Sequence, residues 1–442
     1  MLSLIGFITI LAIVLLLLSG KLTPMIPLVL IPIIGAFVMG FGFGEIGDFF
    51  HDGLGSVLDV VVMFIFAILY FGLMQDAGLF DPLINKMIGW SKGSVVTVSV
   101  ATVLIAAVAH LDGSGASTFL ITIPALLPLY NRLKMSRYLL LLLIGGSASV
   151  MNMVPWAGPL GRTASVLKMD VAELWHPLIP IQIIGMILMV GLAILLGFRE
   201  KKRIERTYGA IDAQAAISEM AGTVKDTKKE SEKRLLARPN MLWFNFILTV
   251  AVIFVLVWGV IPAGFTFMIG LCIALPLNYP KIKDQTERIR THAPNALTMA
   301  SIILAAGSFL GILSGTGMLD AIAKDMVKVL PGFIGPYLHL VLGVIGIPLE
   351  LLLSTDAYYF ALLPVADSIG SGFSIDSLSM SYAMIVGNIV GTFISPFSPA
   401  LWLALGLAGA EMGKHIRYSI FWLWGISLVL LLVSVVTGVI HI

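Results

Sequence analysis

The chain has 442 residues, of which 58% are hydrophobic and 12% are charged, and its net charge is +2. Soluble domains carry roughly 25% charged residues, so this composition, with a mean hydropathy of +1.01, excludes a soluble globular protein. It predicts an all-α integral membrane protein of the cell inner or plasma membrane, with lipid around it and no nucleic-acid partner. The single cysteine excludes an internal disulfide.

Ten apolar runs are long enough to cross roughly 30 Å of hydrocarbon as helices. The first run lacks a basic leading region and a small-residue cleavage site, so we interpret it as a span and not as a signal peptide. Two further apolar regions, 94–131 and 331–366, are interrupted by polar residues near their middles. The predicted spans are 2–19, 24–43, 56–76, 138–156, 177–198, 241–258, 262–279, 296–316, 380–405 and 418–440.

The distribution of Lys and Arg predicts the orientation, because cytoplasmic loops of membrane proteins are rich in these residues. Loop 199–240 is strongly basic, and we place it in the cytoplasm, which puts both termini outside. Loops 44–55 and 367–379 contain Asp or Glu but no Lys or Arg, as expected outside. Of the 27 basic residues, all but Arg162, Lys168, Lys324 and Lys328 then lie inside.

The two halves of the chain resemble each other. Segment 72–81 aligns with 311–320 at an offset of 239 residues, and Pro155 aligns with Pro396 at an offset of 241. Each half holds five predicted crossings, so the second half must be inserted upside down. Inverted repeats with interrupted helices in matching positions are typical of secondary transporters. We predict that both interrupted regions are re-entrant hairpins; pairs of ordinary spans joined by tight turns are the alternative.

The first interruption, at 110–118, is a polar run in an apolar region. Irregular backbone at membrane depth is tolerated only where it is buried in protein or lines a wet cavity. Glycines allow a tight turn and the close approach of a ligand, and the start of the next helix favours an anion. Capping of that helix by a hydroxyl is the alternative. The predicted binding residues here are Asp112, Gly113, Ser114, Gly115, Ser117 and Thr118.

The second interruption offers the same kinds of groups, and its predicted binding residues are Ser354, Thr355 and Asp356. Ionisable residues inside a membrane are costly and are candidates for function. We therefore predict that Asp112 and Asp356 bind a cation or transfer a proton, with helix capping as the alternative. His110 aligns with Glu350 just ahead of each interruption, and either a core role or proton transfer fits both. The proton-coupling candidates are His110, Asp112, Glu350 and Asp356.

Two of the spans are expected to be broken helices, because each contains a proline at the same relative position. Unwound carbonyls and polar side chains at that depth coordinate ions and substrates in transporters. A proline kink with helix–helix hydrogen bonds is the alternative. The residues that these helices add to the predicted substrate site are Asn152, Asn388, Thr392 and Ser395.

These motifs resemble the citrate–divalent-metal/proton symporter family (CitMHS), a branch of the ion transporter superfamily. The resemblance covers nearly the whole chain, and examples are MNMVPWAGP at 151–159 and DAYYF at 356–360. The other segments that carry it are 66–72, 78–84, 111–113, 121–123 and 311–316. The family implies uptake of metal-bound citrate driven by protons. The superfamily implies a homodimer and an elevator-type transporter, with a scaffold and a mobile transport part.

With that division, the repeat predicts two scaffold parts and two transport parts. The scaffold parts are 1–92 and 241–329, and the linker between the repeats is 199–240. The transport parts are 93–198, with hairpin 94–131 and broken helix 138–158, and 330–442, with hairpin 331–366 and broken helix 380–405.

Two positions depart from the family pattern. Typical members carry a second aspartate where this chain has Ser114, and they tend to read Gln-Pro-x-His where it reads Asn388-Ile-Val-Gly. Loss of a carboxylate beside the substrate changes the charge that the site prefers. A less positively charged substrate, such as an uncomplexed carboxylate, fits this change.

The leading hypothesis is a proton-coupled symporter of citrate, carried as a complex with Mg²⁺ or a similar divalent ion. Mg²⁺ prefers oxygen ligands, so citrate itself would supply most of the ligands of the metal. Asp112 and Asp356 are candidate further ligands, and no resident cofactor is expected. The alternatives are another di- or tricarboxylate, an uncomplexed carboxylate, or sodium coupling. Because no nucleophile elbow, zincin or Walker motif is present, an intramembrane enzyme is disfavoured. A channel is also disfavoured, because it needs a continuous polar path and the polar residues here concentrate at two breaks.

Overall fold

The computed structural model describes residues 2–19, 21–82, 86, 94–208, 236–258, 261–329 and 331–442, and these residues form helices and loops without a β-strand. The centre of the predicted linker, residues 209–235, and the predicted boundary at 92 lie outside the described residues. Most of the predicted spans and interruptions correspond to helices and helix breaks in the structure.

The first half of the chain contains the following helices, with 3₁₀ turns written η. They are α1 (Leu2–Ser19), α2 (Met25–Val38), α3 (Phe43–Gly55), α4 (Leu58–Asp76), α6 (Val95–Ala109), η1 (His110–Asp112), α7 (Gly115–Arg132), α8 (Arg137–Met151), α9 (Gly158–Leu167), α10 (Val171–Trp175) and α11 (Leu178–Tyr208).

The second half has a matching series, in which η5 is a π-helical turn. Its elements are η3 (Pro239–Met241), α14 (Leu242–Trp258), α15 (Ala263–Asn278), α16 (Ile282–Gly315), α17 (Met318–Val329), η4 (Gly335–Tyr337), α18 (Leu338–Val344), α19 (Gly346–Glu350), η5 (Ala357–Leu362), α20 (Leu363–Ser371), α21 (Ser377–Asn388), η6 (Ile389–Gly391), α22 (Pro399–Ala408) and α23 (Met412–Val436).

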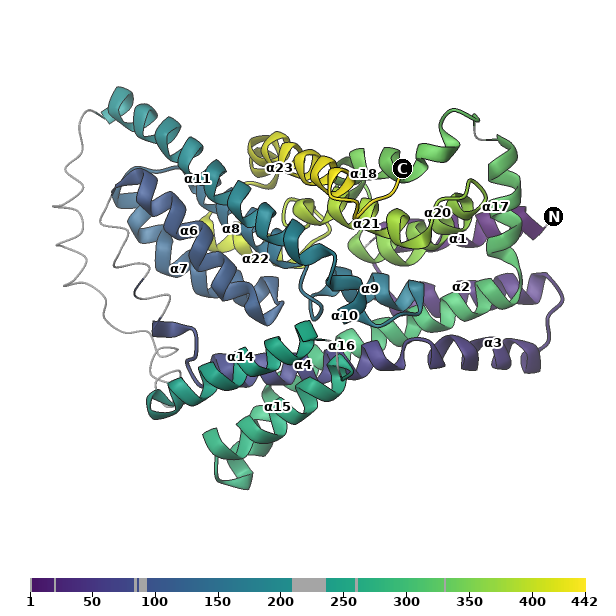
Figure 1. Cartoon of the computed structure of the whole chain (residues 1–442), viewed down its shortest axis with the longest axis horizontal. Helices are drawn as coiled ribbons and strands as arrows, with labels where there is room; N and C mark the ends of the chain where they lie inside the picture. The colour runs from purple at the N-terminus through teal and green to yellow at the C-terminus, as the bar shows by residue number, and fades with distance from the viewer. Residues whose placement is uncertain are drawn as a thin grey trace.

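The helices form two layers in the view of Figure 1, with α9 and α10 between them. One layer holds α2, α3, α4, α14, α15 and α16, with α4 packed on α15 and α16. The other holds α6, α7, α8, α11 and the helices from α18 to α23, with α11 packed on α6 and α8. Helix α1 packs against α2 and α17. The segments that carry the predicted site therefore lie in one layer, with α9 at its edge.

Within the described residues, six helices are long and apolar enough to cross a membrane by themselves. They are Leu58–Asp76, Val95–Asp112, Leu178–Thr207, Pro239–Trp258, Ile282–Gly315 and Met412–Val436. The remaining apolar helices are shorter, and the two broken spans divide into α8 with α9 and α21 with α22. The chain is thus a multi-pass membrane protein built from helices.

The prediction that 44–55 is a loop was wrong, because most of this segment forms helix α3. The carboxylate of Glu45 accepts a hydrogen bond from the backbone N–H of Gly42 at 2.9 Å, which closes the first turn. A Cβ at Gly53 would collide with the carbonyl oxygen of Gly307 on α16. Glycine thus lets α3 lie directly against α16, as small residues do between membrane helices.

Candidate functional site

The first interruption is a tight turn that ends one helix and starts another. After α6, His110–Asp112 form a 3₁₀ turn, and Gly113 adopts φ 70°, a left-handed conformation that favours glycine. Ser114 is the N-cap of α7, and its hydroxyl accepts a hydrogen bond from the N–H of Ser117 at 3.4 Å. The carboxylate of Asp112 accepts the N–H of Ser114 at 2.9 Å. Capping thus engages Asp112, Ser114 and Ser117 within the turn, which we name the first tip (residues 110–118).

His110 is fully buried beside this tip and uses both ring nitrogens. Its Nδ1 lies 2.7 Å from the hydroxyl of Thr118, and its Nε2 lies 2.8 Å from Oδ1 of Asn152. The ring also meets Phe393 edge-on, with 5.7 Å between ring centroids. The structure therefore brings together three predicted residues, from the first tip and from the end of α8.

Glu350 has a similar environment at the second interruption. It is fully buried, and it accepts hydrogen bonds from the hydroxyl of Thr355 at 3.0 Å and from the amide of Asn388 at 2.7 Å. Its carbonyl oxygen accepts the hydroxyl of Ser395 at 2.7 Å. Tyr359 completes the cluster by donating to Oδ1 of Asn388 at 3.2 Å. Sequence reasoning missed Tyr359, because an aromatic residue in an apolar run carries no signal of its partner.

The second tip (residues 351–356) lies between α19 and η5. The hydroxyl of Ser354 accepts the N–H of Ala357 at 3.2 Å, which caps the following turn. Asp356 forms an ion pair with Arg162 of α9, with 2.7 Å between Oδ1 and Nε. The side chains are only 14% and 11% exposed, respectively. Arg162 was predicted to lie in an outside loop, whereas the structure places it in a helix and against the second tip.

The two broken helices end before their prolines. Helix α8 ends at Met151, ahead of Pro155, and α21 with η6 ends at Gly391, ahead of Pro396. The hydroxyl of Thr392 donates a hydrogen bond to the carbonyl of Ile389 at 2.7 Å. Thr392 therefore stabilises the backbone turn at the break, whereas Asn388 and Ser395 contact Glu350.

Gly115 is explained by packing. A Cβ at Gly115 would lie 2.5 Å from the ring of Phe393 and 3.0 Å from Cβ of Ala400, so this glycine lets the first tip touch the second broken helix. A Cβ at Gly113 would lie 3.1 Å from the carbonyl oxygen of Trp156. We expected these glycines to let a ligand approach the backbone. At Gly115 the neighbours are instead Phe393 and Ala400 of the same protein.

The two tips share no hydrogen bond or ion pair among the described residues, and α9 lies between them. Gly113 of the first tip faces Trp156 and Ala157, which lead into α9. One turn further along α9, Arg162 binds the second tip through Asp356. The two predicted metal ligands, Asp112 and Asp356, thus have separate partners. No cluster of three or more His, Cys, Asp or Glu ligands occurs in the described part of the chain.

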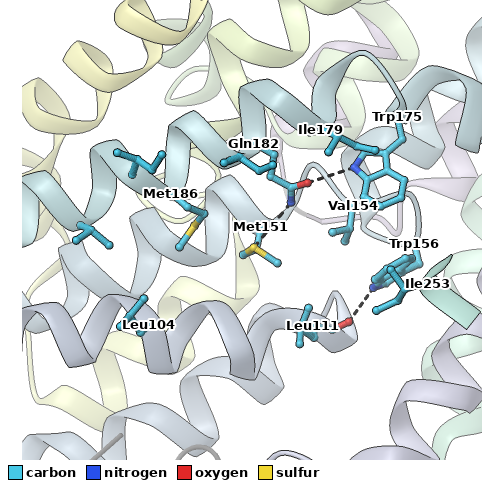
Figure 2. A pocket seen from close by; sticks show the side chains of 13 residues that line it. Leu104, Leu111, Met151, Val154, Trp156, Trp175, Ile179, Gln182, Met186 and Ile253 are labelled. Atoms are coloured by element: carbon cyan, nitrogen blue, oxygen red, sulfur yellow. Dashed lines mark hydrogen bonds between the residues drawn. The ribbon is translucent and has the colours of Figure 1, made fainter. Parts of the chain in front are cut away.

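An apolar pocket of about 530 Å³ lies beside the first tip (Figure 2). Leu111 and Trp156 line it, and the indole N–H of Trp156 donates to the carbonyl of Leu111 at 2.8 Å. Gln182 is the polar side chain in its wall, and it accepts the indole N–H of Trp175 at 3.2 Å. A pocket with this lining does not offer charged partners to a carboxylate, so the polar breaks and not this pocket form the candidate substrate site.

The sequence of this chain matches the family model described as "Citrate transporter" over residues 3–387. The chain belongs to the citrate transporter family. A "Citrate transporter" of Bacillus subtilis (strain 168) is 37% identical over 440 residues and covers 100% of both chains. A "Mg(2+)/citrate complex secondary transporter" of the same organism is 36% identical over 444 residues, also with 100% of both chains covered.

The fold of this citrate transporter family member also occurs in a solved structure. The YdaH transporter of Alcanivorax borkumensis superposes with a TM-score of 0.56 and 17% identity, covering 90% of this chain and 88% of that one. At this identity the likeness concerns the fold alone. The family and the helical membrane fold together make this protein a membrane transporter and not an enzyme.

Proposed function

We propose that this chain is a secondary active transporter that carries citrate together with protons, with a divalent ion such as Mg²⁺ bound to the citrate. The observation that carries the proposal is the pairing of each helix break with a buried ionisable residue. His110 is bonded to Thr118 and Asn152, and Glu350 is bonded to Thr355 and Asn388. Buried groups of this kind, held by neutral partners, suit reversible protonation during transport.

The substrate site lies between the two tips in this proposal. Hydroxyl groups and helix starts at both breaks offer hydrogen-bond donors to citrate carboxylates. Mg²⁺ prefers oxygen ligands and keeps several waters, so citrate supplies most of the ligands of the metal. Asp112 and Asp356 complete its surroundings. The relative named for a Mg(2+)/citrate complex supports this choice of substrate.

The architecture that we propose has two inverted repeats, with re-entrant hairpins at 94–131 and 331–366. The scaffold parts, 1–92 and 241–329, stay fixed in a homodimer, and the transport parts, 93–198 and 330–442, move as an elevator. Both termini lie outside, and loop 199–240 lies in the cytoplasm. The layer of α2, α3, α4, α14, α15 and α16 in Figure 1 supports such a division, because all of it comes from the proposed scaffold parts. Helices α1 and α17, also assigned to the scaffold, instead pack against η5 and α20 of the transport part.

Uncomplexed citrate is the second candidate substrate, and Ser114 favours it. Its hydroxyl caps α7 at the place where an aspartate would add a negative charge. Another di- or tricarboxylate and sodium coupling are further alternatives.

Uptake of labelled citrate into proteoliposomes tests the proposal. Protein purified in detergent is reconstituted, and uptake is measured with and without Mg²⁺ and with an imposed pH or sodium gradient. We expect accumulation that requires the pH gradient and increases with Mg²⁺. Absence of gradient-dependent uptake of any carboxylate would contradict symport, and dependence on sodium alone would replace the proton.

A further inference from the structure

Arg162 of α9 is a buried cation whose partner leaves most of its hydrogen-bonding capacity unused. It contacts Asp356 through Nε at 2.7 Å, and its guanidinium lies over the ring of Phe360, with 5.8 Å between Cζ and the centroid. Among the described residues, no hydrogen bond is made by its two terminal nitrogens. Arg has five donors arranged in a planar fork that matches a carboxylate, so this guanidinium retains donors for a second carboxylate.

The start of α9 lies directly against this guanidinium. A Cβ at Gly158 would collide with Nη1 of Arg162, so the guanidinium lies directly over this glycine. Ala157 is the N-cap, and α9 therefore begins without a side-chain cap on its first N–H groups. Trp156 and Ala157 touch Gly113 of the first tip. Arg162 thus lies where the first tip, the start of α9 and the second tip converge.

The charges around the tips also require a cation. Asp112, Glu350 and Asp356 are acidic, whereas no Lys or Arg occurs at 110–118, 350–356 or 388–398. The permanent cation that the structure places against the second tip is Arg162 of α9. A polycarboxylate that enters such a surrounding needs a positive partner, since unpaired buried charges are costly. The ion pair with Asp356 keeps Arg162 neutralised before the substrate arrives.

We propose that Arg162 binds a carboxylate group of the substrate, and that Asp356 holds the guanidinium in place and gives up part of its contact when the substrate binds. This inference rests on the proposed transport of a carboxylate. It assigns the positive partner of the substrate to a residue outside both tips, on the helix between them.

Citrate binding to the purified full-length protein, with and without Mg²⁺, separates this role from a structural one. We expect Arg162→Lys, which keeps the charge but loses the fork, to weaken citrate binding about ten- to a hundredfold. Without Mg²⁺, Asp356→Asn should bind free citrate at least as tightly as the wild type, because the amide releases the guanidinium; with Mg²⁺ it also loses the carboxylate that lies near the metal in the proposed site. Equal losses of free-citrate binding in both variants, or wild-type binding by Arg162→Lys, would overturn the proposal.

Two further variants keep the test decisive if Arg162→Lys fails to fold. The double variant Arg162→Gln with Asp356→Asn leaves no unpaired charge and should still lose citrate binding about ten- to a hundredfold; wild-type binding by it would refute the assignment. Lys168→Gln removes an exposed positive charge from the end of the same helix and should bind as the wild type does. Failure of the wild type to bind or transport any carboxylate would instead contradict the proposed function.

Discussion

Ser114 is the residue at which this chain departs from the family pattern, and the structure shows what its hydroxyl does. It caps α7 by accepting hydrogen bonds from the N–H and the hydroxyl of Ser117, at 3.4 and 3.2 Å. Aspartate is an equally good N-cap residue. A carboxylate can therefore replace the hydroxyl here without loss of the helix start.

Ser114→Asp is expected to shift substrate preference toward metal-bound citrate. The added carboxylate repels free citrate more strongly than the Mg²⁺ complex, because the metal cancels most of the citrate charge, an effect on the order of 1 to 4 kcal/mol near a protein surface. The ratio of KM values for free and Mg²⁺-bound citrate should change by about tenfold or more. Ser94→Asp, at the exposed N-cap of α6, is the matched control. An unchanged ratio would show that position 114 does not select the charge of the substrate.

Thr118 supports His110 and also bonds to its own helix. Its hydroxyl lies 2.7 Å from the imidazole and 2.8 Å from the carbonyl of Ser114. Thr118→Val leaves a buried ring nitrogen without a partner, which costs about 1 to 3 kcal/mol. Thr122→Val removes only a hydroxyl bonded within the helix. Thermal unfolding in detergent should show a clearly lower Tm for Thr118→Val; equal Tm values in the two variants would refute a supporting role for Thr118.

Several of these residue contacts were predictable in part. The sequence alignment paired His110 with Glu350, and the structure buries both beside helix breaks. Their amide partners do not follow the repeat: Asn152 and Asn388 are not at equivalent positions in the alignment. Arg162 could not be assigned from sequence, because its partner Asp356 lies 194 residues away and charge counting places a lone arginine in a loop.

Where two helices pack closely, the contact depends on glycines. A Cβ at Gly387 of α21 would collide with the carbonyl oxygen of Gly343 at α18, and Gly346 faces the same strip of backbone. Small residues allow membrane helices to approach this closely. The end of α21, and with it Asn388 beside Glu350, is therefore held by backbone contact.

Gly387→Ala should reduce the yield of folded protein and lower its Tm, since overpacking against backbone lowers the free energy of unfolding by about 1 to 3 kcal/mol. Gly425→Ala is the control, because open space surrounds Gly425 in α23. Alanine favours helix over glycine by roughly 1 kcal/mol, so this control should keep or raise the Tm. Equal behaviour of the two variants in size-exclusion profiles and unfolding would contradict the packing role.

The bounds of a helix were predictable where an apolar composition determines them. They were less predictable where packing against another helix determines them. Long apolar runs such as 177–198 predicted α11, because few other structures satisfy the backbone in lipid. Helix α3 was missed, since its glycines and acidic residues are typical of a loop. Its helical state depends on contact with α16, which no local pattern reports.

At the scale of the whole molecule, the family and the helical fold place this protein among membrane transporters. The hydropathy pattern predicted membrane helices, because lipid leaves few ways to satisfy a backbone. The internal alignment predicted a transporter, because inverted repeats are typical of that class. Neither could predict that α9 lies between the tips. That placement arises from contacts between segments far apart in the chain.

Proton movement measured together with citrate uptake tests the proposed symport most directly. Proteoliposomes with a trapped pH indicator receive labelled citrate with Mg²⁺, without an imposed pH gradient. The wild type is expected to acidify the lumen as citrate enters. Glu350→Gln should exchange citrate across the membrane at equilibrium but should carry fewer protons per citrate, whereas Glu173→Gln, at an exposed site, should behave as the wild type does. Citrate uptake by the wild type without proton entry would contradict proton coupling.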